Sequence, residues 1–171
     1  MATLEARIAA VGGADSATVQ ALFEDAVAHW RAAGAKVAGL IEEAHGLQGR
    51  TCSAGVLRNI ISGEAHSIFL ETPPRDTSCH IDAAGAERAC AALLDQIPAS
   101  DLVVLSKFGK LEAAHGGLLH AFEAAVAAGK PVLTTVSAKH REAWQAFAPA
   151  ATVLPADAAA LQDWWVAVRP T

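Results

Sequence analysis

The sequence has 171 residues, a formal net charge of −5, 53% hydrophobic residues and 18% charged residues. This composition excludes a disordered chain, and the length suits one globular domain over residues 1–171. The 13 lysines and arginines form no basic run, which argues against a nucleic-acid partner.

The sequence also argues against export and membrane insertion. No stretch reaches the ~20 apolar residues of a membrane-spanning helix, and the first residues do not resemble a signal peptide. Cys52, Cys79 and Cys90 are an odd number of cysteines at irregular spacing, which suits reduced thiols in the cytosol. We therefore expect a cytoplasmic protein.

Strand-like and helix-like segments alternate from the start of the chain. Residues 7–11 form a short apolar run that ends in Gly12 and Gly13, and Asp15 or Ser16 could cap a following helix. Along that helix, apolar side chains recur at helical spacing: Val19, Leu22, Phe23, Ala26, Val27 and Trp30. A second strand is expected over residues 36–41.

Residues 46–74 interrupt this alternation. Two runs, 52–60 and 65–70, flank a Ser-Gly pair at 62–63, a pattern that predicts an inserted β-hairpin. A helix is expected over 82–97, with Cys90 on its apolar face, so Cys90 should be buried and unreactive.

The second half of the sequence returns to the alternation. Residues 101–105 (DLVVL) are a continuous apolar run, typical of a strand that is buried on both faces of a parallel sheet. The remaining elements are expected as a helix over 118–126, a strand over 131–136, a helix with Trp144 and Phe147, a strand over 152–154, and a last helix with Trp164 and Trp165.

This order predicts an α/β fold with a doubly wound, mostly parallel sheet. Ligands of such sheets bind outside the carboxyl ends of the strands. Three loops should share that edge, namely residues 12–16, 106–117 and 137–140.

Two segments resemble the small THEP-type P-loop nucleoside-triphosphatases. The segment DLVVLSKFGKLEAAHGGLLHAFEAAVAAGKPVLTTV resembles the second half of those proteins, and GRTCSAGVLRNIISGE resembles their arginine-bearing hairpin. Lys107-Phe108-Gly109-Lys110 with Glu112 is similar to a bacterial branch of uncharacterised function that is associated with molybdenum uptake genes. The resemblance implies a P-loop NTPase-like fold over nearly the whole chain and a link to molybdenum metabolism.

The residues of a working P-loop are missing. The motif G-x-x-x-x-G-K-[ST] uses its lysine and backbone N–H groups to cradle phosphates and its hydroxyl to hold Mg²⁺. Counted from Gly12, its last three positions fall on Ala17, Thr18 and Val19, and counting from Gly13 is no better.

The acidic pair expected at the end of the 101–105 strand is missing too, because Ser106 and Lys107 stand there. Phosphoryl transfer with Mg²⁺ depends on positioning and charge neutralisation by these groups. The degenerate Walker motifs therefore predict no meaningful hydrolysis of ATP or GTP. The sequence therefore identifies no catalytic residue.

The lysines at this strand end suggest a binding function instead. Together with the Gly12-Gly13 backbone and the first helix N-terminus, they could bind a nucleotide phosphate or a small oxyanion. The predicted ligand-binding residues are Gly12, Gly13, Asp15, Ser16, Lys107, Gly109, Lys110 and Glu112. The alternative is that Lys107 pairs with Glu112 or Asp101 while Lys110 is solvated.

Two other functions stay open. One is a nucleoside-triphosphatase with residual or altered activity that uses Lys110 and Glu112. The other is a metal or redox protein built on Cys52, Cys79 and His80, although no CxxC or HxxxH spacing supports it. The sequence leaves the cofactor, the ligand and a homo-oligomeric state open.

Overall fold

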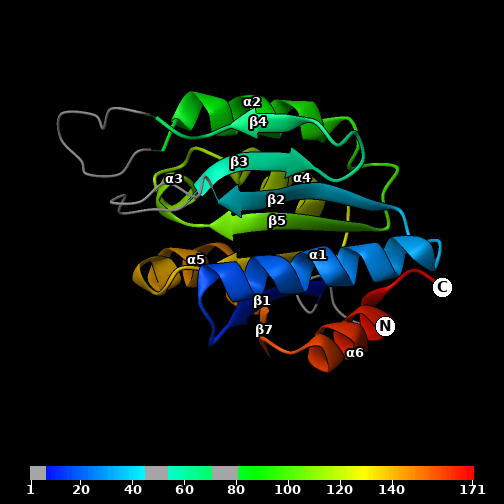
Figure 1. Cartoon of the computed structure of the whole chain (residues 1–171). Helices are drawn as coiled ribbons and strands as arrows, with labels where there is room; N and C mark the ends of the chain where they lie inside the picture. Colours follow the sequence, from blue (N-terminus) through cyan, green and yellow to red (C-terminus); the bar gives the residue numbers. More distant parts are fainter. Residues whose placement is uncertain (1–6, 45–53, 71–80) are drawn as a thin grey trace.

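The computed structural model describes residues 7–44, 54–70 and 81–171. The described residues form a seven-stranded sheet in the order β4-β3-β2-β5-β6-β1-β7 (Figure 1). Its strands are β1 (Ile8–Gly12), β2 (Val37–Ala44), β3 (Ala54–Asn59), β4 (Ala65–Ser67), β5 (Leu102–Phe108), β6 (Val132–Val136) and β7 (Thr152–Pro155). Strands β2, β5, β6, β1 and β7 are parallel, whereas β3 and β4 are antiparallel additions.

Helices cover both faces of this sheet. They are α1 (Ser16–Ala32), α2 (Ala83–Leu94), α3 (Lys110–Ala113), α4 (Leu119–Ala127), α5 (Arg141–Phe147) and α6 (Ala158–Val168), with a 3-10 turn η2 (Ala138–His140). One buried cluster joins the sheet to α2, α4 and α5, and a second joins it to α1 and α6. The expected α/β, doubly wound, P-loop NTPase-like fold is thereby confirmed. Within the described part, no helix is long and apolar enough to span a membrane.

The aromatic side chains anchor these two clusters, as their helical spacing predicts. Trp30 of α1 packs against Trp165 of α6, with ring centroids 5.6 Å apart. On the other face, Phe108 packs against Phe122 and Trp144 at 5.7 and 5.2 Å. Because Phe108 is the last residue of β5, this packing fixes the strand end where ligands of such sheets bind.

The beginning of α1 follows the expected capping pattern. The Asp15 side chain accepts a hydrogen bond from Thr18 N at 2.8 Å, which satisfies one of the free N–H groups of the first turn. At the other end, Gly34 has a φ of +95°, a left-handed conformation that glycine adopts without steric penalty.

Two strands are longer than the sequence indicates. Strand β2 continues through residue 44 because its second half pairs with β3, which places Glu42 opposite Leu57. Strand β5 continues through Ser106 and Lys107 because, after a register shift, Phe108 pairs with Val136 of β6. Lys107 thus belongs to the end of a strand and not to a loop.

The inserted hairpin is confirmed for the residues that the structure describes. Strand β3 pairs antiparallel with β4, for example Leu57 with His66, and the hairpin extends the sheet beyond β2. The prediction that Cys90 is buried is also confirmed, since this side chain is 3% exposed.

Candidate functional site

The parallel strands bring the expected loops to one edge of the sheet. Residues 12–16, 109–117 and 137–140 follow the carboxyl ends of β1, β5 and β6. Ser137 N donates a hydrogen bond to Phe108 O at 3.4 Å, which ties the loop after β6 to the end of β5. The edge is therefore a continuous surface built from segments that are far apart in the sequence.

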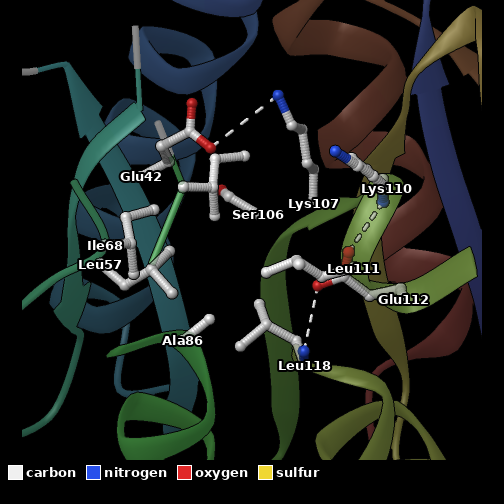
Figure 2. Close-up of a pocket in the computed structure, with 12 residues that line it drawn as sticks. Glu42, Leu57, Ile68, Ala86, Ser106, Lys107, Lys110, Leu111, Glu112 and Leu118 are labelled. Atoms are coloured by element: carbon white, nitrogen blue, oxygen red, sulfur yellow. Dashed lines mark hydrogen bonds and ion pairs between the residues drawn. The ribbon is translucent and has the colours of Figure 1, made fainter. Parts of the chain in front are cut away.

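A pocket, called the β5 pocket below, opens at the end of β5 (Figure 2). Its polar lining comes from Glu42, Ser106, Lys107, Lys110 and Glu112. Its apolar lining comes from Leu57, Ile68, Ile81, Ala86, Leu111 and Leu118. Figure 2 shows Glu42, Lys107 and Lys110 together at one end of the pocket, with the apolar side chains beyond them. The cavity volume is about 40 Å³, enough for a few atoms.

Glu112 holds the turn that carries Lys110. Its side chain is buried, one oxygen accepts a hydrogen bond from Gly109 N and the other from Leu118 N, both at 3.0 Å. Burial raises the pKa of Glu112, while these two backbone donors and the charge of Lys107 act in the opposite direction. Both carboxylate oxygens are thus engaged with the backbone, and the residue shapes the pocket from within.

Lys107 faces Glu42 of the neighbouring strand. The distance from Lys107 Nζ to Glu42 Oε2 is 4.0 Å, and the Glu42 side chain is 7% exposed. Burial raises the pKa of the Glu42 carboxyl, and the Lys107 ammonium partly offsets that effect. The alternative reading of the sequence pairs Lys107 with Glu112 or Asp101, but the ion pair of Lys107 in the described residues is with Glu42.

Glu42 is the site residue that the sequence reasoning missed. It lies just past the expected end of the second strand, and its position opposite Leu57 depends on pairing with the inserted hairpin. The sequence does carry a signal that carboxylates lie at the end of this strand, because Glu42 and Glu43 directly follow the apolar run at 37–41. A carboxylate in that position lies at the same sheet edge as Lys107.

A second hollow, called the α1 hollow, lies on the other side of Glu42. It is lined by Ser16, Ala17, Gln20, Ala21, Glu24, Glu42, Glu43 and Ala44. Glu43 is engaged with Arg58 of β3, and the contact from Arg58 Nη2 to Glu43 Oε2 is 3.0 Å. Glu42 therefore lines both hollows.

The predicted ligand residues of the first loop are not part of the β5 pocket. Asp15 accepts hydrogen bonds from Thr18 N and Thr18 Oγ1, which lower the pKa of its carboxyl. Ser16 lines the α1 hollow, while Gly12, Gly13 and Asp15 line neither of the two hollows. The structure thus brings Lys107, Gly109, Lys110 and Glu112 together and leaves the first loop beside them.

The residues at the two Walker positions do not fit Mg²⁺, which requires oxygen ligands in octahedral geometry. Val19, which has no hydroxyl, stands at the Ser/Thr position, and the hydroxyl of the preceding Thr18 donates to Asp15. An ammonium group, that of Lys107, lies at the end of β5. No group of three or more His, Cys, Asp or Glu residues suited to a metal occurs in residues 7–44, 54–70 and 81–171. The metal prediction for Cys52, Cys79 and His80 lies outside these described residues.

The fold defines a P-loop NTPase-like α/β protein. The chain belongs to the family described as protein of unknown function (DUF2478), which matches residues 8–164. A molybdenum import ATP-binding protein, ModC 2 of Bradyrhizobium diazoefficiens, is 34% identical over 136 residues. That alignment covers 78% of this chain and 15% of the relative. No solved structure matches. Membership of the THEP-type family stays a prediction.

Proposed function

We propose that this chain binds a small anion at the carboxyl edge of its sheet and does not hydrolyse nucleotides. The ligand is a nucleotide phosphate or a small oxyanion. The observation that carries the proposal is that two lysines, Lys107 and Lys110, line one pocket at the end of β5. A parallel α/β sheet binds its ligands at this edge.

The pocket strengthens contacts between these lysines and an anion. Lys107 is only 31% exposed, and apolar side chains close the far end of the cavity. Charges interact more strongly away from bulk water. A hydrogen bond to a charged group contributes about 1.5–3 kcal/mol. Glu112 supports the site by fixing the turn between Gly109 and Leu118.

The residues at the positions of the Walker motifs argue against nucleotide hydrolysis. Thr18 and Val19 stand where a P-loop has its lysine and its hydroxyl, and Ser106 and Lys107 stand where the acidic pair belongs. The alternative of residual nucleotide chemistry would use Lys110 and Glu112, but the Glu112 oxygens already accept two backbone hydrogen bonds. These bonds stabilise the ionised carboxylate, so they make it a weaker base toward water.

The size of the pocket favours a compact anion. A cavity of about 40 Å³ is well below the ~150 Å³ that accommodates benzene in a protein core. A tetrahedral oxyanion or a terminal phosphate fits this space better than a nucleobase. The relative that is named a molybdenum import ATP-binding protein makes molybdate the first anion to test and ATP the second.

A binding screen tests the proposal directly. Thermal unfolding is followed with molybdate, sulfate, phosphate and ATP, the last with and without Mg²⁺, and phosphate release is measured in parallel. An anion at 100 times its Kd should stabilise the fold by about 2.7 kcal/mol. The double variant Lys107→Ala/Lys110→Ala should lose this effect, whereas Lys130→Ala, at the opposite edge of the sheet, should keep it. Phosphate release near one turnover per second, or stabilisation by no anion at all, would overturn the proposal.

A further inference from the structure

The β5 pocket holds two carboxylates as well as two ammonium groups. Glu112 accepts hydrogen bonds from Gly109 N and Leu118 N, so its negative charge is stabilised by backbone donors. Glu42 lines the same pocket, and its ionic partner among the described residues is Lys107. The two carboxylates therefore differ: Glu112 has two backbone donors besides the charge of Lys107, whereas Glu42 forms an ion pair with Lys107, the cation that an anionic ligand would also contact.

An anion entering beside Lys107 would meet the Glu42 carboxylate at close range. Both would be partly shielded from water, so their repulsion would be stronger than at an exposed site. The anion would also neutralise Lys107, the ammonium that favours the ionised form of the Glu42 carboxylate. Both effects favour addition of a proton to Glu42 when the anion binds.

We propose, on the basis of the anion-binding function above, that Glu42 couples the binding of a fully ionised oxyanion to the uptake of one proton. The proton comes from solvent and adds to a Glu42 carboxylate oxygen. The resulting carboxyl donates an O–H hydrogen bond to the anion, while Lys107 contacts the anion instead of Glu42. Hydrogen phosphate carries its own proton and can donate it to the Glu42 carboxylate in a hydrogen bond, so its binding needs no uptake.

The charged groups around Glu42 are consistent with this coupling. Glu24 of α1 and Glu43 of β2 share the α1 hollow with it, and Glu43 is paired with Arg58 of β3. Lys110 and Glu112 of α3 lie across the β5 pocket. Leu57 of β3 and Ile68, which follows β4, line the pocket and are apolar. His66 of β4 lies beside Leu57 in the sheet, and its Nε2 atom is 3.8 Å from Glu64 Oε2. Burial raises the pKa of Glu42, and Lys107 is the group that opposes the rise.

The number of protons taken up can be measured without assuming a structure of the complex. Calorimetric titrations with molybdate are carried out in two buffers that differ in ionisation enthalpy. The pH is about 8, well above the ordinary pKa of a glutamate, because burial raises the pKa of Glu42. The wild type should take up about one proton per molybdate, and its affinity should rise about tenfold for each unit of pH decrease. Phosphate at the same pH should bind with almost no uptake.

Two variants test whether Glu42 is the residue that takes up the proton. Glu42→Gln should bind molybdate without proton uptake, at least about tenfold more tightly than the wild type at pH 8, and with little dependence on pH. Glu43→Gln is the matched control on the same strand, and its proton count should equal that of the wild type.

The outcomes separate the inference from the proposed function. Molybdate binding by the wild type without proton uptake, or uptake that persists in Glu42→Gln, overturns the inference and leaves anion binding intact. Binding of ATP without binding of any oxyanion overturns the inference alone, and binding of none of molybdate, sulfate, phosphate and ATP overturns both. Should Glu42→Gln fail to fold, the proton count and the pH dependence of the wild type decide the question alone.

Discussion

Ser106 of β5 donates a hydrogen bond to Gln20 Oε1 of α1 at 2.5 Å. Both side chains are buried, with exposed fractions of 2% and 8%. The bond joins the first helix to the strand end that carries Lys107, one residue further on. It links the two segments that would hold phosphate and metal in a working P-loop enzyme.

This bond should contribute measurably to stability. Ser106→Ala leaves Gln20 Oε1 buried without its donor, and Gln20 Nε2 already has no partner among the described residues. We expect the free energy of unfolding to fall by about 1–3 kcal/mol, measured by urea denaturation. The exposed Ser67→Ala is the control and should change it little. The double variant Gln20→Leu/Ser106→Ala should recover most of the loss, because it removes both buried polar groups. A Ser106→Ala protein as stable as the wild type would show that the bond contributes nothing.

Glu112 should matter for stability and for binding together. In Glu112→Gln, an amide N–H₂ group faces one of the two backbone donors, Gly109 N or Leu118 N. We expect a loss of about 1–3 kcal/mol in the free energy of unfolding. Weaker anion binding should accompany it, because the turn that carries Lys110 loosens. Urea denaturation and calorimetric titration test the two effects, and Glu123→Gln is the control, because the Glu123 side chain on α4 is exposed. Unchanged stability in Glu112→Gln would mean that the turn is held by other contacts.

The sequence predicts the framework of this site better than its chemistry. The apolar run at 102–105 and the helical stripe of α1 identify the elements, because burial on both faces or on one face leaves a periodic pattern. The continuation of β5 through Ser106 and Lys107 leaves no such pattern, since polar residues interrupt the run. It depends on the pairing of Phe108 with Val136, which lies 28 residues later in the sequence (136 − 108).

The partner of Lys107 could not be predicted for a similar reason. Glu42 reaches it because β2 and β5 are parallel neighbours, a relationship between strands that are separated by a hairpin and a helix. Glu112 was rightly placed near the lysines, but its role depends on Leu118 N, which the chain brings back after the short helix α3. A four-residue helix has no periodicity to reveal it.

The two adjacent glutamates of β2 should respond to pH with opposite signs. Burial raises the pKa of Glu42 above its ordinary value of 4.5, so its contribution to stability is full below that value and is lost as the pH rises through the raised pKa. The hydrogen bond from Arg58 lowers the pKa of Glu43, so its contribution is present above 4.5 and is lost as the pH falls through the lowered pKa.

We therefore expect Glu42→Gln to become more stable than the wild type as the pH rises above 4.5, and equal to it in acid. Glu43→Gln should be less stable than the wild type at neutral pH, and this difference should disappear in acid. Urea denaturation of the ligand-free wild type, Glu42→Gln and Glu43→Gln from pH 3 to 8 measures how the free energy of unfolding of each protein depends on pH. Parallel curves for the two variants would contradict the assigned environments.

The last prediction concerns the unequal roles of the two lysines. Each should contribute to anion binding, and loss of one charge-assisted contact of about 1.5–3 kcal/mol corresponds to a roughly ten- to a hundredfold weaker Kd. Only Lys107 is also the ionic partner of the buried Glu42 carboxylate, so Lys107→Ala should destabilise the ligand-free fold at neutral pH.

Lys110→Ala should weaken anion binding with a smaller cost in stability, because Lys110 is exposed at the start of α3. Adding Glu42→Gln to Lys107→Ala should restore stability, since it removes the unpaired charge. The double variant should still bind the anion more weakly than Glu42→Gln alone, because it lacks the Lys107 cation. The affinity is measured by calorimetric titration with molybdate, and the stability is measured by urea denaturation. Both measurements are made on the wild type, Lys107→Ala, Lys110→Ala, Glu42→Gln and Lys107→Ala/Glu42→Gln, with Lys130→Ala as the control. If Lys107→Ala binds as tightly as the wild type, or if Glu42→Gln fails to rescue its stability, the pairing of Lys107 with Glu42 does not govern this site.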